Sequence, residues 1–343
     1  MFQQLVKIIA GGGGAAARPS MDGVLEQMDS HLDNVERLIQ PAPDSKPRTA
    51  FDVDLPKERL SMLNLSPRQR LKVLTKALPL FIHMRRAARL YDDAFQPLEY
   101  EASPDFLAGL EALAYRLGAK AVKYVKVPRQ AIFRDKGIPA PYALVFTVVM
   151  DKEPLDTAPS FDCQHEVMRG YKNMAVIANR LADFMRDHGF AAYPGTALGG
   201  VTDYTQLAEL AGLGAIGYHG LLISPGEGAR LRINTVYTNI TNLPLEKKNE
   251  HLWVRDFCAM CKKCIRSCPV EAIFDQPRPR GDGGRQCIDH DTCRDYFAAN
   301  YGCGVCLVVC PFSQVGYEIV KARFKGNDQA PKFWIDLEPA HLT

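Results

Sequence analysis

The stretch CAMCKKCIRSCP, residues 258–269, decides how the C-terminal part of this chain folds. A second run, CGVCLVVCP, occupies residues 303–311, and the segment 256–314 holds nine of the ten cysteines. A chain of 343 residues buries enough surface to fold without disulfides or metals. Cysteines at this density therefore require a chemical explanation.

The first run has the spacing C-x2-C-x2-C-x3-C-P of bacterial ferredoxins, in which three thiolates bind one cluster and the fourth binds the other. The second run supplies the complementary C-x2-C-x3-C-P. We therefore predict two 4Fe-4S clusters in a separate small module. One ligand set is Cys258, Cys261, Cys264 and Cys310, and the other is Cys268, Cys303 and Cys306 completed by Cys293 or Cys287.

Two other uses of these cysteines are disfavoured. Structural zinc usually takes two separate C-x2-C pairs, and three cysteines at successive x2 spacings crowd a tetrahedral site. Disulfides need an oxidising compartment, and residues 1–17 show no signal peptide that would deliver the chain there. The remaining cysteine, Cys163, is interpreted as a small buried hydrophobe.

The chain before the module alternates helical and strand-like patterns. Residues 1–55 are interpreted as a flexible arm with one helix over 21–39. Periodicity and capping signals predict helices over 56–95, 104–117, 165–188 and 207–211, and strands over 121–127, 143–150, 190–193, 221–224 and 231–237. We predict an α+β fold, with a helical and α/β domain over 56–250 and the cysteine module over 251–343.

Charge and hydropathy exclude several classes of partner. The formal net charge of +3, from 42 basic and 39 acidic residues, gives no basis for binding nucleic acid. No apolar run reaches the roughly 18 residues that a membrane span requires. We expect a cytoplasmic protein; its oligomeric state stays open, with a homo-oligomer as one alternative.

The segment GLGAIG, residues 212–217, matches the dinucleotide motif G-x-G-x-x-G. It follows an apolar helix instead of a strand, and no acidic residue stands in a strand context about 20 positions further on. The glycines are therefore interpreted as permitting a tight turn between a helix and a strand.

The same glycines belong to a longer pattern. AGLG at 211–214, LLISP at 221–225 and GARLR at 228–232 precede the two cysteine runs. Together with CRDYF at 293–297, this pattern resembles the corrinoid iron-sulfur reductive dehalogenases and, less closely, epoxyqueuosine reductase. The resemblance implies a base-off cobalamin in a nitroreductase-like layer close to one cluster. It assigns cofactor binding to Gly212, Gly214, Gly217, His219 and Leu221, and it favours Cys293 over Cys287 as the eighth cluster ligand.

In that family a tyrosine backed by a cationic side chain supplies the proton that replaces the halogen. By motif, Tyr171 matches the proton donor and Arg232 the cation. A tyrosine hydroxyl, with an ordinary pKa of about 10, is protonated at neutral pH, and a guanidinium stabilises the phenolate that it leaves. Reserve candidates are Tyr193, Tyr204 and His219. The resemblance thus implies an oxidoreductase with a small organohalide substrate and an external low-potential electron donor.

Two features depart from the family pattern. Gly199 stands where many members have an asparagine, and the usual twin-arginine leader is missing. Both favour an intracellular enzyme or an altered substrate.

Two alternative functions are weighed against this one. An epoxyqueuosine reductase would act on a tRNA, but only 33 residues follow Cys310 and the charge lacks an RNA footprint. Asp203 is the residue nearest to the acid of that family. The second alternative is a corrinoid reductase or electron carrier that serves another protein. A carrier would contain iron without cobalt.

Overall fold

The structure is a computed structural model, and it describes residues 38–48, 61–92, 95–134 and 136–324. Its main sheet has the strand order β1-β2-β6-β3, and each neighbouring pair is antiparallel. The strands are β1 (Ala121–Lys126), β2 (Tyr142–Val149), β6 (Leu231–Thr238) and β3 (Ala192–Pro194). The sequence predicted all four of them, and the antiparallel pairing makes this layer α+β.

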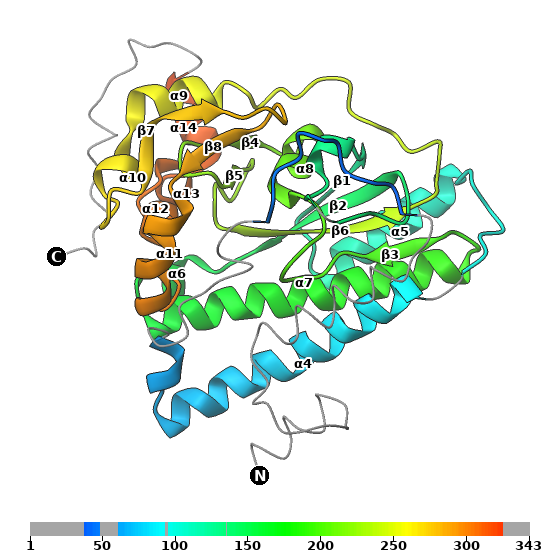
Figure 1. Cartoon of the computed structure of the whole chain (residues 1–343), viewed down its shortest axis with the longest axis horizontal. Helices are drawn as coiled ribbons and strands as arrows, with labels where there is room; N and C mark the ends of the chain where they lie inside the picture. The colour runs from blue at the N-terminus through cyan, green and yellow to red at the C-terminus, as the bar shows by residue number, and fades with distance from the viewer. Residues whose placement is uncertain (1–37, 49–60, 93–94, 135, 325–343) are drawn as a thin grey trace.

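Helices cover both faces of the sheet. One face carries α4 (Pro67–Asp92), α5 (Pro104–Leu117) and α7 (Phe161–Asp187), and Figure 1 shows the long α4 and α7 side by side. Leu144 and Phe146 of β2 pack into this cluster, whereas Val145 points to the other face and joins Leu207 of α8 (Tyr204–Leu210). Because β2 is covered on both faces, its sequence is an almost continuous apolar run.

Serine caps begin α5 at its predicted start and α4 at Pro67, inside the helix predicted over 56–95. The Ser103 hydroxyl accepts the N–H of Phe106 at 3.2 Å, and Pro104 takes the first helical position of α5. Ser66 and Gln69 form a capping box at α4, because each side chain accepts the backbone N–H of the other. Local sequence therefore sets where these helices start.

The cysteine module consists of short elements, drawn from yellow to red-orange at one end of the sheet in Figure 1. Its helices are α9 (Val254–Cys261), α10 (Lys263–Arg266), α11 (His290–Ala299), α12 (Val305–Val308), α13 (Pro311–Gln314) and α14 (Tyr317–Phe324). The strands β7 (Ile273–Pro279) and β8 (Arg285–Ile288) pair as an antiparallel hairpin.

Smaller elements complete the connections between the layer and the module. They are η2 (Ser61–Asn64), η3 (Arg129–Ala131), α6 (Lys152–Leu155), β4 (Ala215–Ile216) and β5 (Leu222–Ile223). The antiparallel pair β4–β5 forms a hairpin between α8 and β6, and its tip is the turn 217–221.

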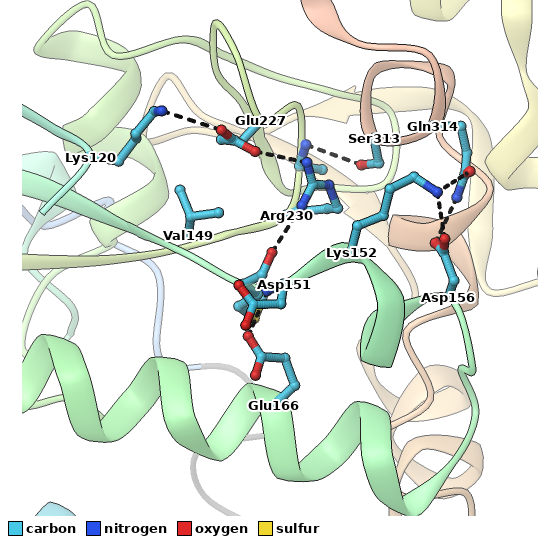
Figure 2. Close-up of polar contacts among 12 residues, drawn as sticks. Lys120, Val149, Asp151, Lys152, Asp156, Glu166, Glu227, Arg230, Ser313 and Gln314 are labelled. Carbon is cyan, nitrogen blue, oxygen red and sulfur yellow. Dashed lines mark hydrogen bonds and ion pairs between the residues drawn. The ribbon is translucent and has the colours of Figure 1, made fainter. Parts of the chain in front are cut away.

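Polar contacts at the start of β6 hold its backbone and join it to the module (Figure 2). The Arg230 guanidinium donates to the carbonyl of Met150 at 3.0 Å and forms an ion pair with Glu227 at 2.7 Å. The backbone N–H of Ala229 donates to the hydroxyl of Ser313 in α13 at 3.3 Å. The Arg230 contacts fix the start of β6 within the layer, and the Ala229–Ser313 contact ties it to the module three residues before Arg232.

The apolar core of the module is shared with the layer. Phe257 and Phe312 meet edge to face with ring centroids 4.9 Å apart. They belong to a hydrophobic cluster that also contains Met150 and Leu155 from the end of β2 and from α6. The module and the layer therefore pack against each other through a common core.

Residues 38–48, part of the predicted flexible arm, lie along the layer. The backbone N–H of Ile39 donates to the carbonyl of Ile138 at 2.8 Å, and Lys46 forms an ion pair with Asp203. Most of the predicted arm and of its helix over 21–39 lies outside the described residues. None of the helices in the described part of the chain is long and apolar enough to cross a membrane.

Candidate functional site

A cavity of about 880 Å³, called the central cavity below, lies beside β6 and α8. Its walls come from α7, the segment 197–206, the β4–β5 hairpin and the β7–β8 hairpin. This volume is near the upper end of the range of roughly 300–1,000 Å³ for small-molecule sites, so the cavity suits a large ligand. Cationic side chains line part of its wall, among them Lys247, Arg255, Arg280 and Arg285.

The structure brings Tyr171 and Arg232 together in this cavity. Tyr171 comes from α7 and Arg232 from β6, and both line the central cavity. The guanidinium carbon of Arg232 lies over the Tyr171 ring, 4.8 Å from its centroid, which is the geometry of a cation–π contact. The buried Nε of Arg232 has no hydrogen-bond partner within the described ranges.

Gly170 makes room for this contact, and the sequence analysis missed it. A Cβ atom there would lie 3.1 Å from Cγ of Arg232 and 3.3 Å from Cγ of Met150. Glycine inside a helix costs about 1 kcal/mol relative to alanine, so an unexplained glycine in α7 signals close packing. The sequence shows the glycine inside a helical segment, but it does not show that the glycine packs against Arg232.

The reserve tyrosines have other surroundings. Tyr204 lines the central cavity, but its hydroxyl donates to the carbonyl of Thr196 at 3.0 Å, and burial raises the pKa of Tyr204 well above its ordinary value. Tyr193 instead packs against Tyr91, with ring centroids 5.7 Å apart, and against the guanidinium of Arg186. Of the three tyrosines considered for proton donation, Tyr171 is therefore the one placed beside a cation in the cavity.

The Asp203 carboxylate has a structural role. Burial disfavours its charge, but the adjacent Lys46 ammonium and the N–H of Gln206 hold the pKa of Asp203 below its usual range. The carboxylate also caps α8, and Arg280 lies 3.9 Å from it. An ionised, paired carboxylate is a poor proton donor, which disfavours the role suggested by epoxyqueuosine reductase.

Gly199, at the family's asparagine position, lines the cavity without a side chain to contact a substrate.

Four cysteines surround a second, small cavity. Cys258, Cys261, Cys264 and Cys310 line it, together with His219 and Phe257. Cys258 and Cys261 share one face of α9, and Lys262, with φ of 51°, ends that helix in a left-handed turn that leads to Cys264. Burial, with Cys310 and Cys264 nearby, raises the pKa of the Cys258 thiol well above its ordinary value.

The other four predicted ligands also lie together. Burial raises the pKa of Cys306, and the neighbouring cysteines Cys264, Cys303, Cys293 and Cys268 add to the effect. For Cys293, burial with Cys303 and Cys268 beside it raises the pKa to about 12. Cys287 has different neighbours, because Arg280, Arg285 and Glu209 surround it and its thiol donates to the carbonyl of Gly217 at 3.6 Å. Of the two alternatives, Cys293 lies with the second cysteine group.

The sulfur atoms do not converge as tightly as ligands of one ion would. Among the residues that the structure describes, no three cysteine, histidine or carboxylate side chains form a group that could hold a single metal ion. The ligand assignment therefore stays a prediction.

His219 lies in the wall between the two cavities. It lines both the central cavity and the small cavity, and it sits in the 217–221 turn of the β4–β5 hairpin. Its Nδ1 accepts the N–H of Leu221 at 3.1 Å, whereas its Nε2 is buried and has no hydrogen-bond partner in the described part of the chain. Burial lowers the pKa of His219 to about 4, so the ring is neutral at pH 7.

The predicted cofactor-binding residues divide into two groups. Leu221, like His219, lines the central cavity, but Gly212, Gly214 and Gly217 are not among the described residues of its wall. A Cβ atom on Gly214 would lie 2.2 Å from the carbonyl oxygen of Ile223, and one on Gly217 would lie 2.7 Å from the Ile223 side chain. These glycines allow the close packing of the β4–β5 hairpin, and their contact with a cofactor stays a prediction.

No protein-family model matches the chain. Curated relatives include tetrachloroethene reductive dehalogenases, 33% identical over 200 residues in Desulfitobacterium hafniense and 33% over 180 residues in Sulfurospirillum multivorans. These alignments cover 54% and 50% of the chain and 35% of each relative, so the chain spans about a third of the length of these relatives. An epoxyqueuosine reductase of Francisella cf. novicida is 29% identical over 175 residues, covering 48% of the chain and 45% of the relative.

Solved structures agree in fold. A reductive dehalogenase studied for B12-dependent dehalogenation superposes with a TM-score of 0.61 at 22% identity, covering 71% of this chain and 38% of the other. A catabolic reductive dehalogenase in complex with 3-bromo-4-hydroxybenzoic acid gives a TM-score of 0.60 at 22% identity, covering 69% and 37%. The predicted resemblance to reductive dehalogenases is thus confirmed. The relatives named here are oxidoreductases, as the sequence analysis predicted for this chain.

Proposed function

We propose that the chain is a corrinoid-dependent reductive dehalogenase that replaces the halogen of a small organohalide by hydrogen. The observation that carries the proposal is the stacking of Arg232 over Tyr171, 4.8 Å from the ring centroid, in the central cavity. His219 lines both the central cavity and the small cavity that four cysteines surround, so the two cavities share a wall. A proton donor, a cation and a site for an electron-delivering cluster are therefore neighbours.

The residues present fit the implied cofactors. Eight thiols in two groups match the donor set of two 4Fe-4S clusters, and the 880 Å³ cavity has room for much of a corrinoid. The cationic wall around Lys247 and Arg285 fits the phosphate-bearing tail of a base-off cobalamin. Within this scheme, residues 56–250 hold most of the corrinoid, and residues 251–343 hold the clusters and contribute Arg285 to the wall beside the corrinoid tail.

The reaction consumes two electrons and one proton, since a carbon–halogen bond breaks, a carbon–hydrogen bond forms and halide leaves. Bound at these sites, the clusters and the corrinoid would supply the two electrons, which an external low-potential donor provides. The Tyr171 hydroxyl gives its proton to the carbon that loses the halogen, and the Arg232 guanidinium stabilises the resulting phenolate. Solvent then returns a proton to Tyr171. Leu198 and Met174 line the same cavity and exclude water around the apolar substrate.

The proposal is tested on the full chain, reconstituted anaerobically with iron, sulfide and cobalamin. We expect about eight irons and about one cobalt per chain, the content of two four-iron clusters and one corrinoid. With titanium(III) citrate as reductant, a bromophenol should release bromide, and protein reconstituted without cobalamin serves as the control. Iron without retained cobalt would identify an electron carrier, and stable zinc binding would contradict the cluster assignment.

A further inference from the structure

We infer that His219 donates a hydrogen bond from Nε2 to a sulfur of the cluster held by Cys258, Cys261, Cys264 and Cys310, and so makes that cluster easier to reduce. The inference rests on the proposed function only in that these four cysteines hold a cluster. His219 would thus set the reduction potential of this cluster, in addition to its predicted contact with the corrinoid.

The hydrogen bonds of His219 determine which ring nitrogen carries the proton. The backbone N–H of Leu221 can only donate, and it points at Nδ1 from 3.1 Å, so Nδ1 must accept. In a neutral imidazole the proton is then on Nε2. Nε2–H is therefore a buried donor, and the described part of the chain offers it no acceptor.

The turn holds this donor in place. The N–H of Gly217 donates to the carbonyl of Leu221 at 3.0 Å, and that of Gly220 donates to the carbonyl of Gly217 at 2.9 Å. A Cβ atom on Gly217 would lie 3.1 Å from Cε1 of His219, so the ring packs directly on this glycine. With only 4% of the residue exposed, water does not satisfy the donor.

A cluster sulfur is the acceptor that the surroundings offer. His219 lines the same small cavity as the four cysteines, and the backbone N–H of the preceding Tyr218 already donates to Cys258. Sulfide and thiolate sulfurs of a cluster accept hydrogen bonds, and such bonds shift its reduction potential. Reduction adds one electron from the external donor and breaks no bond. An N–H dipole aimed at the cluster favours the more negative state, which raises the potential.

The test compares His219→Leu, which removes the N–H, with His219→Gln, whose side-chain amide can place an N–H near the position of Nε2. Both proteins are reconstituted and assayed for iron, and each cluster is titrated with a mediated reductant under electron paramagnetic resonance. The cluster held by Cys258, Cys261, Cys264 and Cys310 is identified as the one whose signal remains in Cys293→Ser. We expect its midpoint potential to become more negative in His219→Leu and to stay near the parent value in His219→Gln. The midpoint potential of the other cluster should be unchanged in both variants.

His290→Leu is the matched control, because His290 lines the central cavity but is not among the described residues of the small cavity. An unchanged potential in fully loaded His219→Leu would overturn the inference, as would an equal shift in the glutamine variant. Loss of cobalamin affinity without a shift would show that Nε2–H serves the corrinoid instead. If His219→Leu holds too little iron, His219→Met gives the same comparison. Failure of the proposed function is seen separately, as missing iron or cobalt in the parent protein.

Discussion

The layer and the cysteine module are built in opposite ways. The layer has helices of 26 and 27 residues on a sheet with two eight-residue strands, whereas helices of the module run from 4 to 10 residues. Among the described residues, those with positive φ that are not glycine all lie in the module: Lys262, Glu271, Tyr301 and Cys303. Such conformations cost about 1–3 kcal/mol each and persist when the surroundings impose them. In the module the proposed clusters would impose them, in addition to the apolar core that the module shares with the layer.

The buried thiols of the module would also be affected by the proposed clusters. Burial, with Cys261 nearby, raises the pKa of Cys310 to about 12. Metal binding requires thiolates, so binding a cluster both removes these protons and stabilises the fold around them. Variants in the layer should therefore leave the iron content of the module unchanged, and variants in the module should leave the fold of the layer unchanged. The predictions below test this separation.

The largest effect is expected in the layer, at Tyr171. Tyr171→Phe removes the proposed proton donor but no predicted metal ligand, so both clusters and the cobalamin should load and be reduced as in the parent. Turnover of an accepted organohalide should fall by about 10² to 10⁴, as for a missing general acid. Halide release and reductive titration measure the two properties on the same sample.

Arg232 provides the companion test. Arg232→Lys keeps the charge without the planar guanidinium and should retain partial activity, and Arg232→Met should be slower. The double variant should be hardly slower than the worse single variant, because groups that act as a unit are not additive. Parent-like turnover by Tyr171→Phe would refute the assignment, and Tyr204 would be tested next.

In the module, Cys293→Ser should lose one cluster of two. Cys293 lies with Cys268 and Cys303, and Cys287 does not, so Cys287→Ser is the matched control that should keep both. Iron content should fall by about half in Cys293→Ser alone. Electron paramagnetic resonance should show one altered signal, while circular dichroism of the long helices of the layer stays the same. The reverse result for the two cysteines would reject the ligand choice.

Gly170→Ala should produce a smaller loss, again without affecting the clusters. The added Cβ would lie 3.1 Å from Cγ of Arg232 and push the guanidinium from the Tyr171 ring. Displacing a catalytic group by a fraction of an ångström should reduce kcat by about tenfold. Gly109→Ala in α5 is the control, because its Cβ would meet only Phe184 at 3.8 Å. Equal rates in both variants would mean that Arg232 can adjust freely.

The smallest effect is expected at Asp203, as a change in stability. Asp203→Asn leaves the largely buried Lys46 without its ion-pair partner and should lower the free energy of unfolding by about 1–3 kcal/mol. The folded-state pKa of Asp203 is lowered, so its contribution is present above the ordinary aspartate pKa of about 3.9 and is lost as the pH falls. Thermal unfolding of parent and variant should therefore differ at pH 7 and converge in acid.

Sequence patterns identified most regular elements of the layer, but neither the short elements of the module nor the contacts between elements. The capping serines and the alternating strands placed α5 and β1 within a residue of their observed bounds. The motif resemblance singled out Tyr171 and Arg232, but the packing that joins them depends on Gly170, which no motif marked. The arm was interpreted as a tether, and yet Lys46 reaches the buried Asp203, because an ion pair across 157 positions leaves no local pattern.

By itself the sequence determined the chemistry that this protein can support. Ligand spacing is a local property, so the two cysteine runs predict seven cluster thiolates without knowledge of the fold. Tertiary structure alone decided which side chains meet: Cys293 with the second cysteine group, Arg232 over Tyr171, and His219 in the wall between two cavities. These contacts follow from how a sheet, its helices and the module pack, and packing depends on distant residues that no short stretch of sequence contains.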